Sequence, residues 1–412
     1  MDKIDGVSID ALAREFGSPL FAASASTIIR NCRAFRAAFS KAYPKVEVAY
    51  SYKVNSVPAI LGIIHGEGLW AEAASGFEYE LARRLGVPGD AVILNGPYKK
   101  KEELRKAVNE GAVINADHFD EIEALEEIAR GEDRTVEIGI RVSMETGIHQ
   151  LPDRFGFNIE SGEAMRAVER ACAGGLLRIA GLHVHLTSYI IEPHEEGGVP
   201  AAHIKHIWPK DPDAYRKAAD AVTRFSKELG EKSGVRMKYI DMGGGFPDAG
   251  TLPPYVEAVT GPMLAGFGKD DPPLLILEPG RAIVRDAIHL ITTVVAVKEL
   301  AGGVRAVVAD AGINVLPTSF WRFQDIECVR DRGGELRDTT VYGPLCLQTD
   351  IIGKCRLPDL KAGDRLVVKN VGAYNVPQSG AFIFPRPPIV MIEGGKAHVV
   401  RRGEAIDDVF PE

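Results

Sequence analysis

The sequence predicts an α/β protein, a (β/α)8 barrel followed by an antiparallel, β-barrel-like domain. Eight apolar segments of strand length alternate with helical patterns or loops over roughly 230 residues, which fits the count and size of such a barrel. After Arg281 the apolar segments are separated by Gly, Pro and Asp, and no long helical period lies between them. A doubly wound sheet stays open as an alternative, because periodicity cannot detect the closure of a barrel.

The barrel strands are expected where short apolar runs occur between helical patterns. They lie at 46–53, 69–73, 91–95, 112–115, 136–142, 178–186, 238–242 and 274–277. Ile28, Phe35 and Phe39 have helical spacing and predict a helix over 27–43. The other helices are expected at 9–16, 77–85, 101–109, 119–130, 162–173 and 213–230.

The second domain is expected to consist mainly of strands. These are predicted at 287–297, 306–309, 340–341, 365–370, 389–392 and 397–401. The first 25 or so residues precede the first barrel helix and are expected to join this domain. We therefore predict a barrel domain of residues 26–280 and a β domain of residues 1–25 plus 281–412.

The composition excludes several classes of protein. A net charge of −8 argues against general affinity for nucleic acid or an anionic membrane. Five widely spaced cysteines contain no CxxC pair, so neither a disulfide framework nor a metal site is expected, and a reducing cytoplasm is the default location. The acidic residues 1–17 are not typical of a signal peptide, and no run of about 18 apolar residues predicts a membrane span.

The strand at 46–53 ends in a lysine, Lys53, which is expected to be buried or nearly so. A buried ammonium group is costly, and one reason to keep it is to use it as a neutral amine or a Schiff base. The alternative is a lysine at the end of a strand whose ammonium group reaches solvent.

Two glycine-containing segments end the seventh and eighth strands. Gly243, Gly244 and Gly245 follow the seventh, and Glu278-Pro279-Gly280-Arg281 follows the eighth. Barrels commonly bind phosphate in these two loops, where glycines let backbone N–H groups approach and an arginine adds charge. A phosphate site and a lysine in one barrel mouth suggest pyridoxal 5′-phosphate, with Glu278 at the ring nitrogen and His185 over the ring face.

These residues stand in motifs that resemble the fold-type III pyridoxal-phosphate-dependent decarboxylases, the group of diaminopimelate and ornithine decarboxylases. The motifs run in family order over nearly the whole chain. They are 50–55 (YSYKVN), 154–156 (RFG), 181–188 (GLHVHLTS), 241–246 (DMGGGF), 278–281 (EPGR), 310–312 (DAG), 343–346 (GPLC) and 372–374 (GAY). The resemblance implies an alanine-racemase-like fold and a carboxy-lyase that acts on an amino acid. The related alanine racemases have an arginine at the position of Glu278, and an acid there favours decarboxylation.

The resemblance also implies a role for each motif. Lys53 carries the cofactor as a Schiff base, His185 stacks on its ring and Glu278 pairs with the ring nitrogen. Its phosphate is held by Ser188, Gly243, Gly244, Gly245, Gly280 and Arg281, with Tyr374 nearby. Cys346 comes from the partner subunit of a head-to-tail homodimer and returns a proton to the substrate, and Asp310 is a weaker candidate for contact with substrate.

The chain departs from the family at the substrate position. Leu347 follows Cys346, where the decarboxylases of diaminopimelate and ornithine have an acid that recognises the distal amino group. The arginine-proline pair expected after 310–312 is also absent, and Leu316-Pro317 stands there. An unpaired buried ammonium group would cost several kcal/mol, so we expect a carboxylated or conjugated amino acid, as in the tailoring of siderophore or antibiotic precursors. A diaminopimelate decarboxylase with an altered distal pocket is the alternative.

Two other classes of function stay open. A metal-dependent barrel hydrolase would use His183, His185, His203 and His206, since an HxH pair on a strand can bind zinc. A non-catalytic carrier of pyridoxal phosphate would need the barrel alone. The segment 189–212, which contains two of these histidines, is long for a loop of a barrel and is either functional or a surface insertion.

Overall fold

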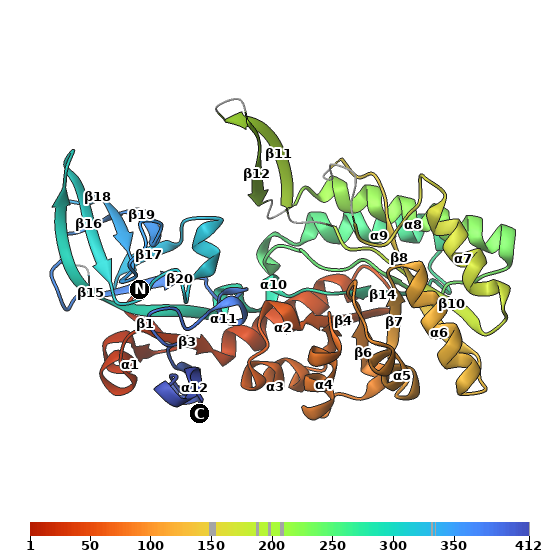
Figure 1. The fold of residues 1–412 in the computed structure, drawn as a ribbon, viewed down its shortest axis with the longest axis horizontal. Coiled ribbons are helices and arrows are strands. Elements are labelled where there is room, and N and C mark those ends of the chain that lie inside the picture. Colours follow the sequence, from red (N-terminus) through yellow and green to blue (C-terminus); the bar gives the residue numbers. More distant parts are fainter. Residues whose placement is uncertain are drawn as a thin grey trace. The chain divides into compact units, whose positions relative to one another are not determined.

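Eight parallel strands close into a barrel, as the sequence predicts (Figure 1). In order around the barrel they are β4 (Val46–Ser51), β5 (Trp70–Ala73), β6 (Val92–Leu94), β7 (Val113–Ala116), β8 (Val136–Ser143), β10 (Leu177–His183), β13 (Tyr239–Asp241) and β14 (Leu274–Leu277). The last strand, β14, pairs in parallel with the first, β4, so that Leu275 lies opposite Val46. This closed ring excludes the doubly wound sheet.

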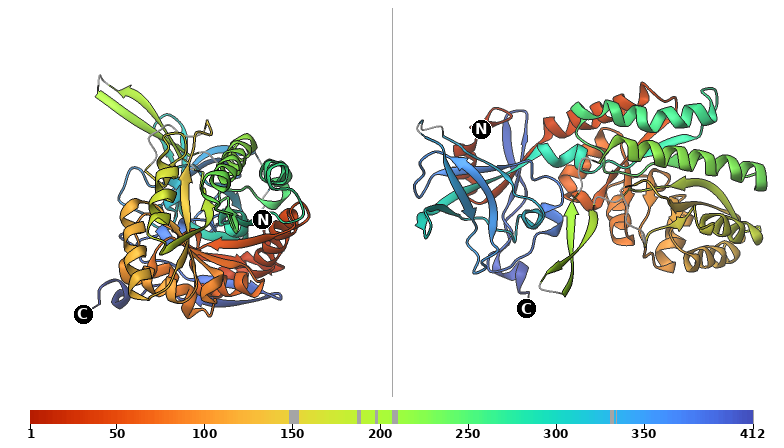
Figure 2. Two further views of the ribbon diagram at one scale, coloured as in Figure 1. Left: turned by 90° about the vertical axis from the view of Figure 1, so that its right-hand side faces the viewer. Right: turned by 90° about the horizontal axis from the view of Figure 1, so that it is seen from above.

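Helices alternate with these strands along the chain and lie outside the barrel (Figures 1 and 2). They are α2 (Ala25–Ser40), α3 (Pro58–Gly66), α4 (Gly76–Arg84), α5 (Lys101–Asn109), α6 (Phe119–Gly131), α7 (Glu163–Ala173), α8 (Pro212–Ser233) and α9 (Pro253–Phe267). Helices α3 and α9 were not predicted from the sequence. Helix α9 starts with two prolines and contains Pro262, a residue type that normally ends a helix.

Tyr239 fills part of the barrel interior. Its hydroxyl donates a hydrogen bond of 2.7 Å to Asn115 Oδ1. A Cβ atom at Gly139 would lie 2.1 Å from this hydroxyl, and one at Gly181 would lie 2.3 Å from the ring. The phenol therefore occupies the space that side chains on the neighbouring strands β8 and β10 would need.

A second sheet contains most of the C-terminal part of the chain. Its strands are β3 (Leu20–Ser24), β15 (Ile288–Leu300), β16 (Val304–Ala309), β17 (Asp325–Cys328), β18 (Arg337–Tyr342), β19 (Ile351–Leu357), β20 (Arg365–Lys369), β21 (Ile389–Glu393) and β22 (Lys396–Arg401). Most pairings are antiparallel, whereas β16 with β18 and β3 with β21 are parallel. Strand β3 also pairs with β15, so the N-terminal segment joins this sheet as predicted. Strands β17 and β19 were not predicted.

The remaining elements are short. They are β1 (Lys3–Ile4), β2 (Val7–Ser8), α1 (Ile9–Phe16), β9 (Phe157–Asn158), α10 (Arg281–Val284), α11 (Asn375–Gln378) and α12 (Ile406–Val409). The predicted loop after β10 instead contains an antiparallel hairpin, β11 (Tyr189–Glu196) and β12 (Val199–His206). Eight consecutive residue pairs join these two strands, so the strands supply hydrogen-bond partners for backbone N–H and C=O groups that would otherwise bond to water.

The chain forms two compact units. The barrel unit comprises residues 31–53 and 64–282, and the sheet unit comprises residues 1–30, 54–63 and 283–412. The computed structural model describes residues 1–147, 154–186, 189–196, 199–206, 210–330, 333 and 335–411, with only the backbone described for the two hairpin strands. Within these residues no helix is long and apolar enough to cross a membrane.

Candidate active site

Lys53 lies directly beyond the carboxyl end of β4. Residues Tyr52–Val54 form a single 3-10 turn, and the Lys53 ammonium group donates a hydrogen bond of 2.7 Å to Glu72 Oε2. The Lys53 side chain is 39% exposed, whereas Glu72 is 1% exposed. The prediction that Lys53 is buried is therefore wrong, because the strand ends two residues before it and the turn follows.

Glu72 is the buried acceptor at this end of the barrel. Its Oε2 atom also accepts a hydrogen bond from the Ser51 hydroxyl, and Oε1 accepts one of 3.3 Å from Asn95 Nδ2. These donors compensate the carboxylate for the water that it loses on burial. Glu72 was not predicted as a site residue, although an acid inside the short apolar strand β5 was a signal for it.

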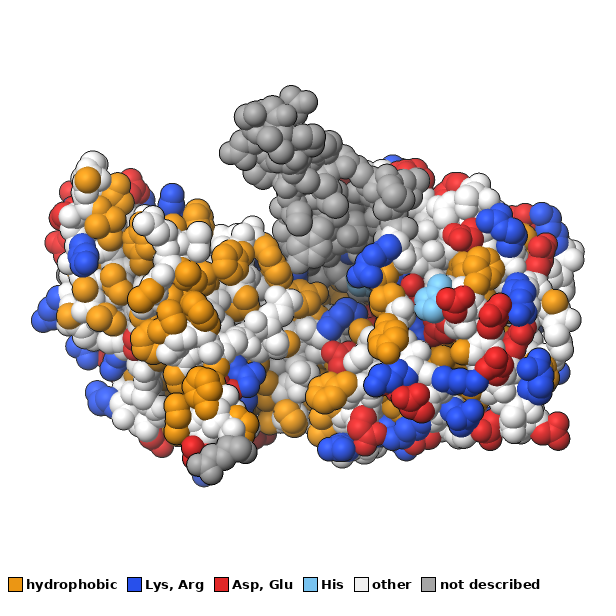
Figure 3. Space-filling view, viewed as in Figure 1, with side chains coloured by type: hydrophobic (Ala, Val, Ile, Leu, Met, Phe, Trp, Pro, Cys, Tyr) orange, Lys and Arg blue, Asp and Glu red, His pale blue; other side chains and the backbone are white. Residues whose placement is uncertain are grey.

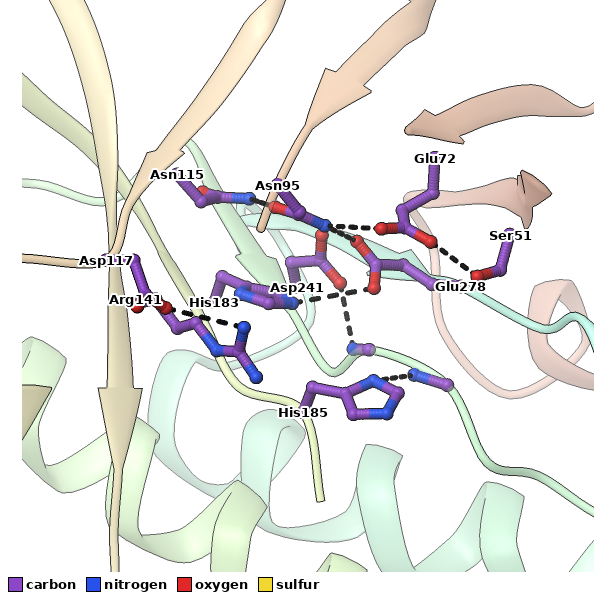
Figure 4. Close-up of polar contacts among 12 residues, drawn as sticks. Ser51, Glu72, Asn95, Asn115, Asp117, Arg141, His183, His185, Asp241 and Glu278 are labelled. Carbon is purple, nitrogen blue, oxygen red and sulfur yellow. Dashed lines mark hydrogen bonds and ion pairs between the residues drawn. The ribbon is translucent and has the colours of Figure 1, made fainter. Parts of the chain in front are cut away.

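Glu278 lies at the centre of the same cluster (Figure 4). Its Oε1 atom accepts a hydrogen bond of 2.6 Å from Asn95 Nδ2, and Oε2 lies 3.5 Å from His183 Nε2. Asn95 is in turn fixed by Asn115, which donates to Asn95 Oδ1 over 2.9 Å. Burial alone would raise the pKa of Glu278, but His183 and Lys53 oppose it and hold the pKa below its ordinary value. Glu278 is therefore a buried carboxylate.

Asp241 is the second buried acid of the cluster. It ends β13, and its Oδ1 atom accepts a hydrogen bond of 2.8 Å from the Gly243 N–H. Burial and the neighbouring charge of Glu278 raise the pKa of Asp241 well above its ordinary value. Of the two acids, Asp241 therefore takes up a proton more readily than Glu278. Asp241 was quoted in the glycine motif but no role was predicted for it.

The glycine triplet lies next to His185. Gly243 and Gly245 have φ angles of +62° and +89°, which side chains strongly disfavour. The N–H of Gly244 donates a hydrogen bond of 3.1 Å to His185 Nδ1. Burial, and then the charges of Lys210, Lys53 and Arg141, lower the pKa of His185 well below its ordinary value. The imidazole is thus neutral, with its remaining proton on Nε2.

Two further strand ends contribute a charged pair to this end of the barrel. Arg141 lies 3.4 Å from Asp117, measured from Nη1 to Oδ1. The guanidinium carbons of Arg141 and Arg154 lie 4.6 and 4.2 Å from the centre of the Phe155 ring. A Cβ atom at Gly156 would come within 2.8 Å of the Arg141 carbonyl oxygen, so this glycine lets the segment 154–156 pass close to β8.

The other predicted residues divide between the two units. Gly280 is buried in the barrel unit, where Arg281 starts α10. Asp310, Cys346, Leu347 and Tyr374 belong to the sheet unit. Cys346 and Leu347 are exposed, and Asp310 accepts hydrogen bonds from the Thr292 hydroxyl and the Thr293 N–H, over 2.5 and 2.8 Å. Tyr374 has a φ angle of +67°, and its N–H donates to the Val54 carbonyl over 2.8 Å. Ser188 lies outside the described residues.

Among the described side chains, His183 and His185 of the hydrolase hypothesis do not form one metal-ligand cluster. Within the described part of the chain, one cluster has metal-ligand spacing, with atoms of His183, Asp241 and Glu278 all within 4.8 Å of one another. His185 is not part of it and accepts the Gly244 N–H instead. The side chains of His203 and His206 lie outside the described residues.

The barrel unit fits pyridoxal phosphate in its residue types. An amine, Lys53, lies near an ionised and buried acid, Glu278, and its charge helps to hold that acid ionised. A neutral aromatic ring, His185, contacts the glycine triplet. Beside the same triplet, Lys210 Nζ would lie only 2.1 Å from a Cβ atom at Gly245, so a cation is present where a phosphate group would need one.

Comparisons with known proteins show the family of the chain. The family described as "Pyridoxal-dependent decarboxylase, pyridoxal binding domain" matches residues 25–195 and 208–285. Diaminopimelate decarboxylases of Bacillus subtilis and Actinosynnema pretiosum are 30% and 31% identical over 99% of this chain, and over 94% and 91% of their own sequences. The solved structure of diaminopimelate decarboxylase from M. jannaschii, in complex with L-lysine, has a TM-score of 0.88 and 26% identity, and the match covers 99% of this chain and 95% of that one.

The family match covers more than half of the chain, and the relatives align along nearly all of it. The glycine triplet, Glu278 and the lysine after β4 all belong to the matched barrel. These findings leave no place for the hydrolase or the non-catalytic carrier. The chain belongs to the fold-type III pyridoxal-phosphate-dependent decarboxylases, and it is a carboxy-lyase that uses this cofactor.

Proposed function

We propose that this enzyme decarboxylates diaminopimelate. The observation that carries the proposal is the similarity to diaminopimelate decarboxylases along 98 to 99% of the chain, at 27 to 31% identity in eight relatives. From the sequence we expected a carboxylated or conjugated amino acid first and diaminopimelate as the alternative, and this similarity favours the alternative. When bound, pyridoxal phosphate supplies an electron sink for the pair of electrons that the departing carboxyl group leaves behind.

Lys53 would hold the cofactor, and Glu72 would hold Lys53. The contact of 2.7 Å between the ammonium group and Glu72 Oε2 keeps the amine at the end of β4. Because Glu72 is buried and accepts from Ser51 and Asn95 as well, its position is fixed by the strands on both sides. An amine in a fixed position reacts more readily, since less freedom is lost on the way to the transition state.

Glu278 would hold the proton on the ring nitrogen. Asn95 and His183 contact its two oxygen atoms, and Asp241, whose pKa is raised, takes up a proton more readily than Glu278 does. A carboxylate that stays ionised while buried interacts strongly with a nearby cationic nitrogen, because little water screens the pair. His185 would cover one ring face, while the glycine triplet, Gly280, Arg281 and Ser188 would bind the phosphate group.

The second part of the proposal is a head-to-tail homodimer in which the partner's Cys346 returns a proton to the substrate. Cys346 is exposed on the sheet unit and has no role in the core of that unit. The same unit has large exposed apolar side chains, and hydrophobic atoms gather on it in Figure 3, whereas the charged groups of both signs are mixed over the barrel helices. These apolar residues include Phe320, Trp321, Phe323, Leu347, Phe382, Ile383 and Phe384. Exposed apolar side chains of this number favour an interface.

Leu347 favours a second candidate substrate, a carboxylated or conjugated amino acid. An apolar residue after Cys346 offers no charge partner to a distal ammonium group. In the sheet unit a cavity of about 300 Å³ is lined by Asp310, Asn314 and Arg386, among others, which offers polar contacts to a longer substituent. Arg386 is itself paired with Glu404, so this cavity is less cationic than its arginine suggests.

Release of carbon dioxide from a panel of substrates tests both candidates. The panel contains diaminopimelate, lysine, ornithine and acylated or acidic amino acids, each measured as kcat/KM with the protein loaded with cofactor. A value of about 10⁴ M⁻¹s⁻¹ or more for diaminopimelate alone is expected, since ordinary enzymes reach this on their own substrates. A value at least 100-fold higher for a conjugate would overturn the first proposal in favour of the second. Leu347→Ala tests the part that Leu347 plays: if this residue selects the substrate, the variant should change the ratio of kcat/KM between diaminopimelate and the conjugates, and an unchanged ratio would contradict a role for Leu347.

A further inference from the structure

Lys210 is a fully buried lysine next to the glycine triplet. It precedes α8 in the barrel unit, is 1% exposed, and its ammonium group donates a hydrogen bond of 2.5 Å to the Leu186 carbonyl oxygen. Its backbone is fixed as well, because the Tyr255 hydroxyl donates to the Lys210 carbonyl over 2.5 Å. The side chain therefore has a defined place and does not reach solvent.

The charge of Lys210 is not compensated by an acid. Among the residues that the structure describes, no carboxylate pairs with it, and the charge that acts on its pKa is that of another cation, Arg281. Burial and then this cation lower the pKa of Lys210 to about 7. The other deeply buried lysine, Lys99, differs: it lies 2.7 Å from Glu121 and has two carbonyl acceptors. A buried cation without an acid is costly, so a function is a better explanation than stability.

The surroundings of Lys210 suit an anion. A Cβ atom at Gly245 would lie 2.1 Å from the ammonium nitrogen and 3.0 Å from the Tyr215 hydroxyl, so only glycine lets Lys210 lie against this turn. Tyr215 donates in turn to the Gly244 carbonyl over 3.0 Å, which fixes the turn on its other side. Backbone N–H groups in such a turn and a nearby ammonium group together bind phosphate oxygens.

We infer that Lys210 binds the phosphate group of the cofactor, in addition to the glycine triplet and Arg281. This rests on the proposed site for pyridoxal phosphate in the barrel unit. Two cations near one turn repel each other until an anion comes between them, so part of the attraction for phosphate comes from relief of that repulsion. Lys210 is thus a binding residue for the phosphate group, and within the described part of the chain no ion pair joins it to an acid.

The test compares the cofactor with and without its phosphate group. Apo-protein is titrated with pyridoxal 5′-phosphate and, separately, with pyridoxal, and binding is followed by absorbance of the protein-bound form. Lys210→Met should weaken pyridoxal 5′-phosphate about 10- to 100-fold, because one hydrogen bond to a charged group is lost, and should change pyridoxal less than threefold or so. Lys232→Met is the matched control, since it removes an exposed lysine near the end of α8, paired with Glu228.

A second variant distinguishes the loss of the charge from the loss of the fold. Lys210→Gln keeps a donor for the Leu186 carbonyl and removes the charge, so it should reproduce the selective loss for the phosphorylated cofactor. Equal binding of pyridoxal 5′-phosphate by wild type and both variants would overturn the inference. An equal loss for the two compounds would also overturn it, because it would reveal a structural role. If the wild-type protein itself bound neither compound, the proposed function would fail as well, and that result is distinct from the other two.

Discussion

Replacing Glu278 by Gln removes one buried charge and keeps the shape of the side chain. The new amide oxygen can still accept from Asn95 Nδ2, now 2.6 Å from Glu278 Oε1, so the barrel should keep its fold. What changes is the partner of the cofactor's ring nitrogen, which a neutral amide no longer keeps protonated. We therefore expect binding of the cofactor to persist while the decarboxylation rate falls.

The magnitude follows from the lost charge. A hydrogen bond to a charged group contributes about 1.5–3 kcal/mol, and this corresponds to a decrease of about 10- to 100-fold in kcat when the contact strengthens in the transition state. Asp241 limits the loss. Burial and then the charge of Glu278 raise the pKa of Asp241, so in Glu278→Gln this pKa falls and Asp241 loses its proton more readily than in the wild type. The double variant with Asp241→Asn lacks any such charge and should lose about tenfold more.

The assay measures kcat from carbon dioxide release for the wild type, the two single variants and the double variant. Cofactor content is measured by absorbance in each sample. An unchanged kcat in Glu278→Gln would refute the role at the ring nitrogen. A double variant no slower than Glu278→Gln would refute the exchange of charge between the two acids.

Three further predictions follow from the described contacts. Lys53→Ala should purify without the absorbance of bound cofactor and without turnover, and normal turnover would contradict its role. Equal mixing of Lys53→Ala with Cys346→Ala should restore about a quarter of wild-type activity, because half of the dimers then contain one intact site in two, and no recovery after verified exchange of subunits would exclude a shared site. Burial lowers the pKa of His289 to about 4, from about 6.5 in an unfolded chain, so its contribution to stability is complete above pH 6.5 and is lost as the pH falls towards 4. Denaturant unfolding at pH 7 and pH 4.5 should show a loss of about 2–3 kcal/mol that is absent from His289→Asn.

The eight barrel strands were predictable because each is a short apolar run bounded by turn residues. A strand that is buried on both faces has no polar period, so the apolar run marks its existence and its ends. The observed β5, Trp70–Ala73, and β14, Leu274–Leu277, differ from the predicted ranges by at most one residue. Closure of the ring was not predictable in the same way, because it depends on pairing between β14 and β4, which lie more than 200 residues apart.

The residues of the candidate site also differ in whether the sequence could predict them. Lys53, Glu278 and the glycine triplet were identified because they follow strands, where barrels place their chemistry. Glu72 was missed because it lies inside β5, and only the structure tells which face it points to. No role was predicted for Asp241, the last residue of β13, because only the structure shows that it lies beside Glu278. Lys210 was missed because it is 35 residues away from Gly245 in the sequence, and only the structure shows that its ammonium group packs closely against this glycine. The hairpin β11–β12 was read as a loop because its charged and proline-containing sequence has no apolar alternation.

The phenol of Tyr239 has a consequence for how this barrel can evolve. Because it fills the space over Gly139 and Gly181, no one of these three positions can change by itself. A larger residue at either glycine would collide with the ring, and a small residue at 239 would leave a void and an amide, Asn115, without its donor. Substitutions at these three positions must therefore occur together. A relative with alanine at position 139 or 181 should have a residue smaller than tyrosine at position 239.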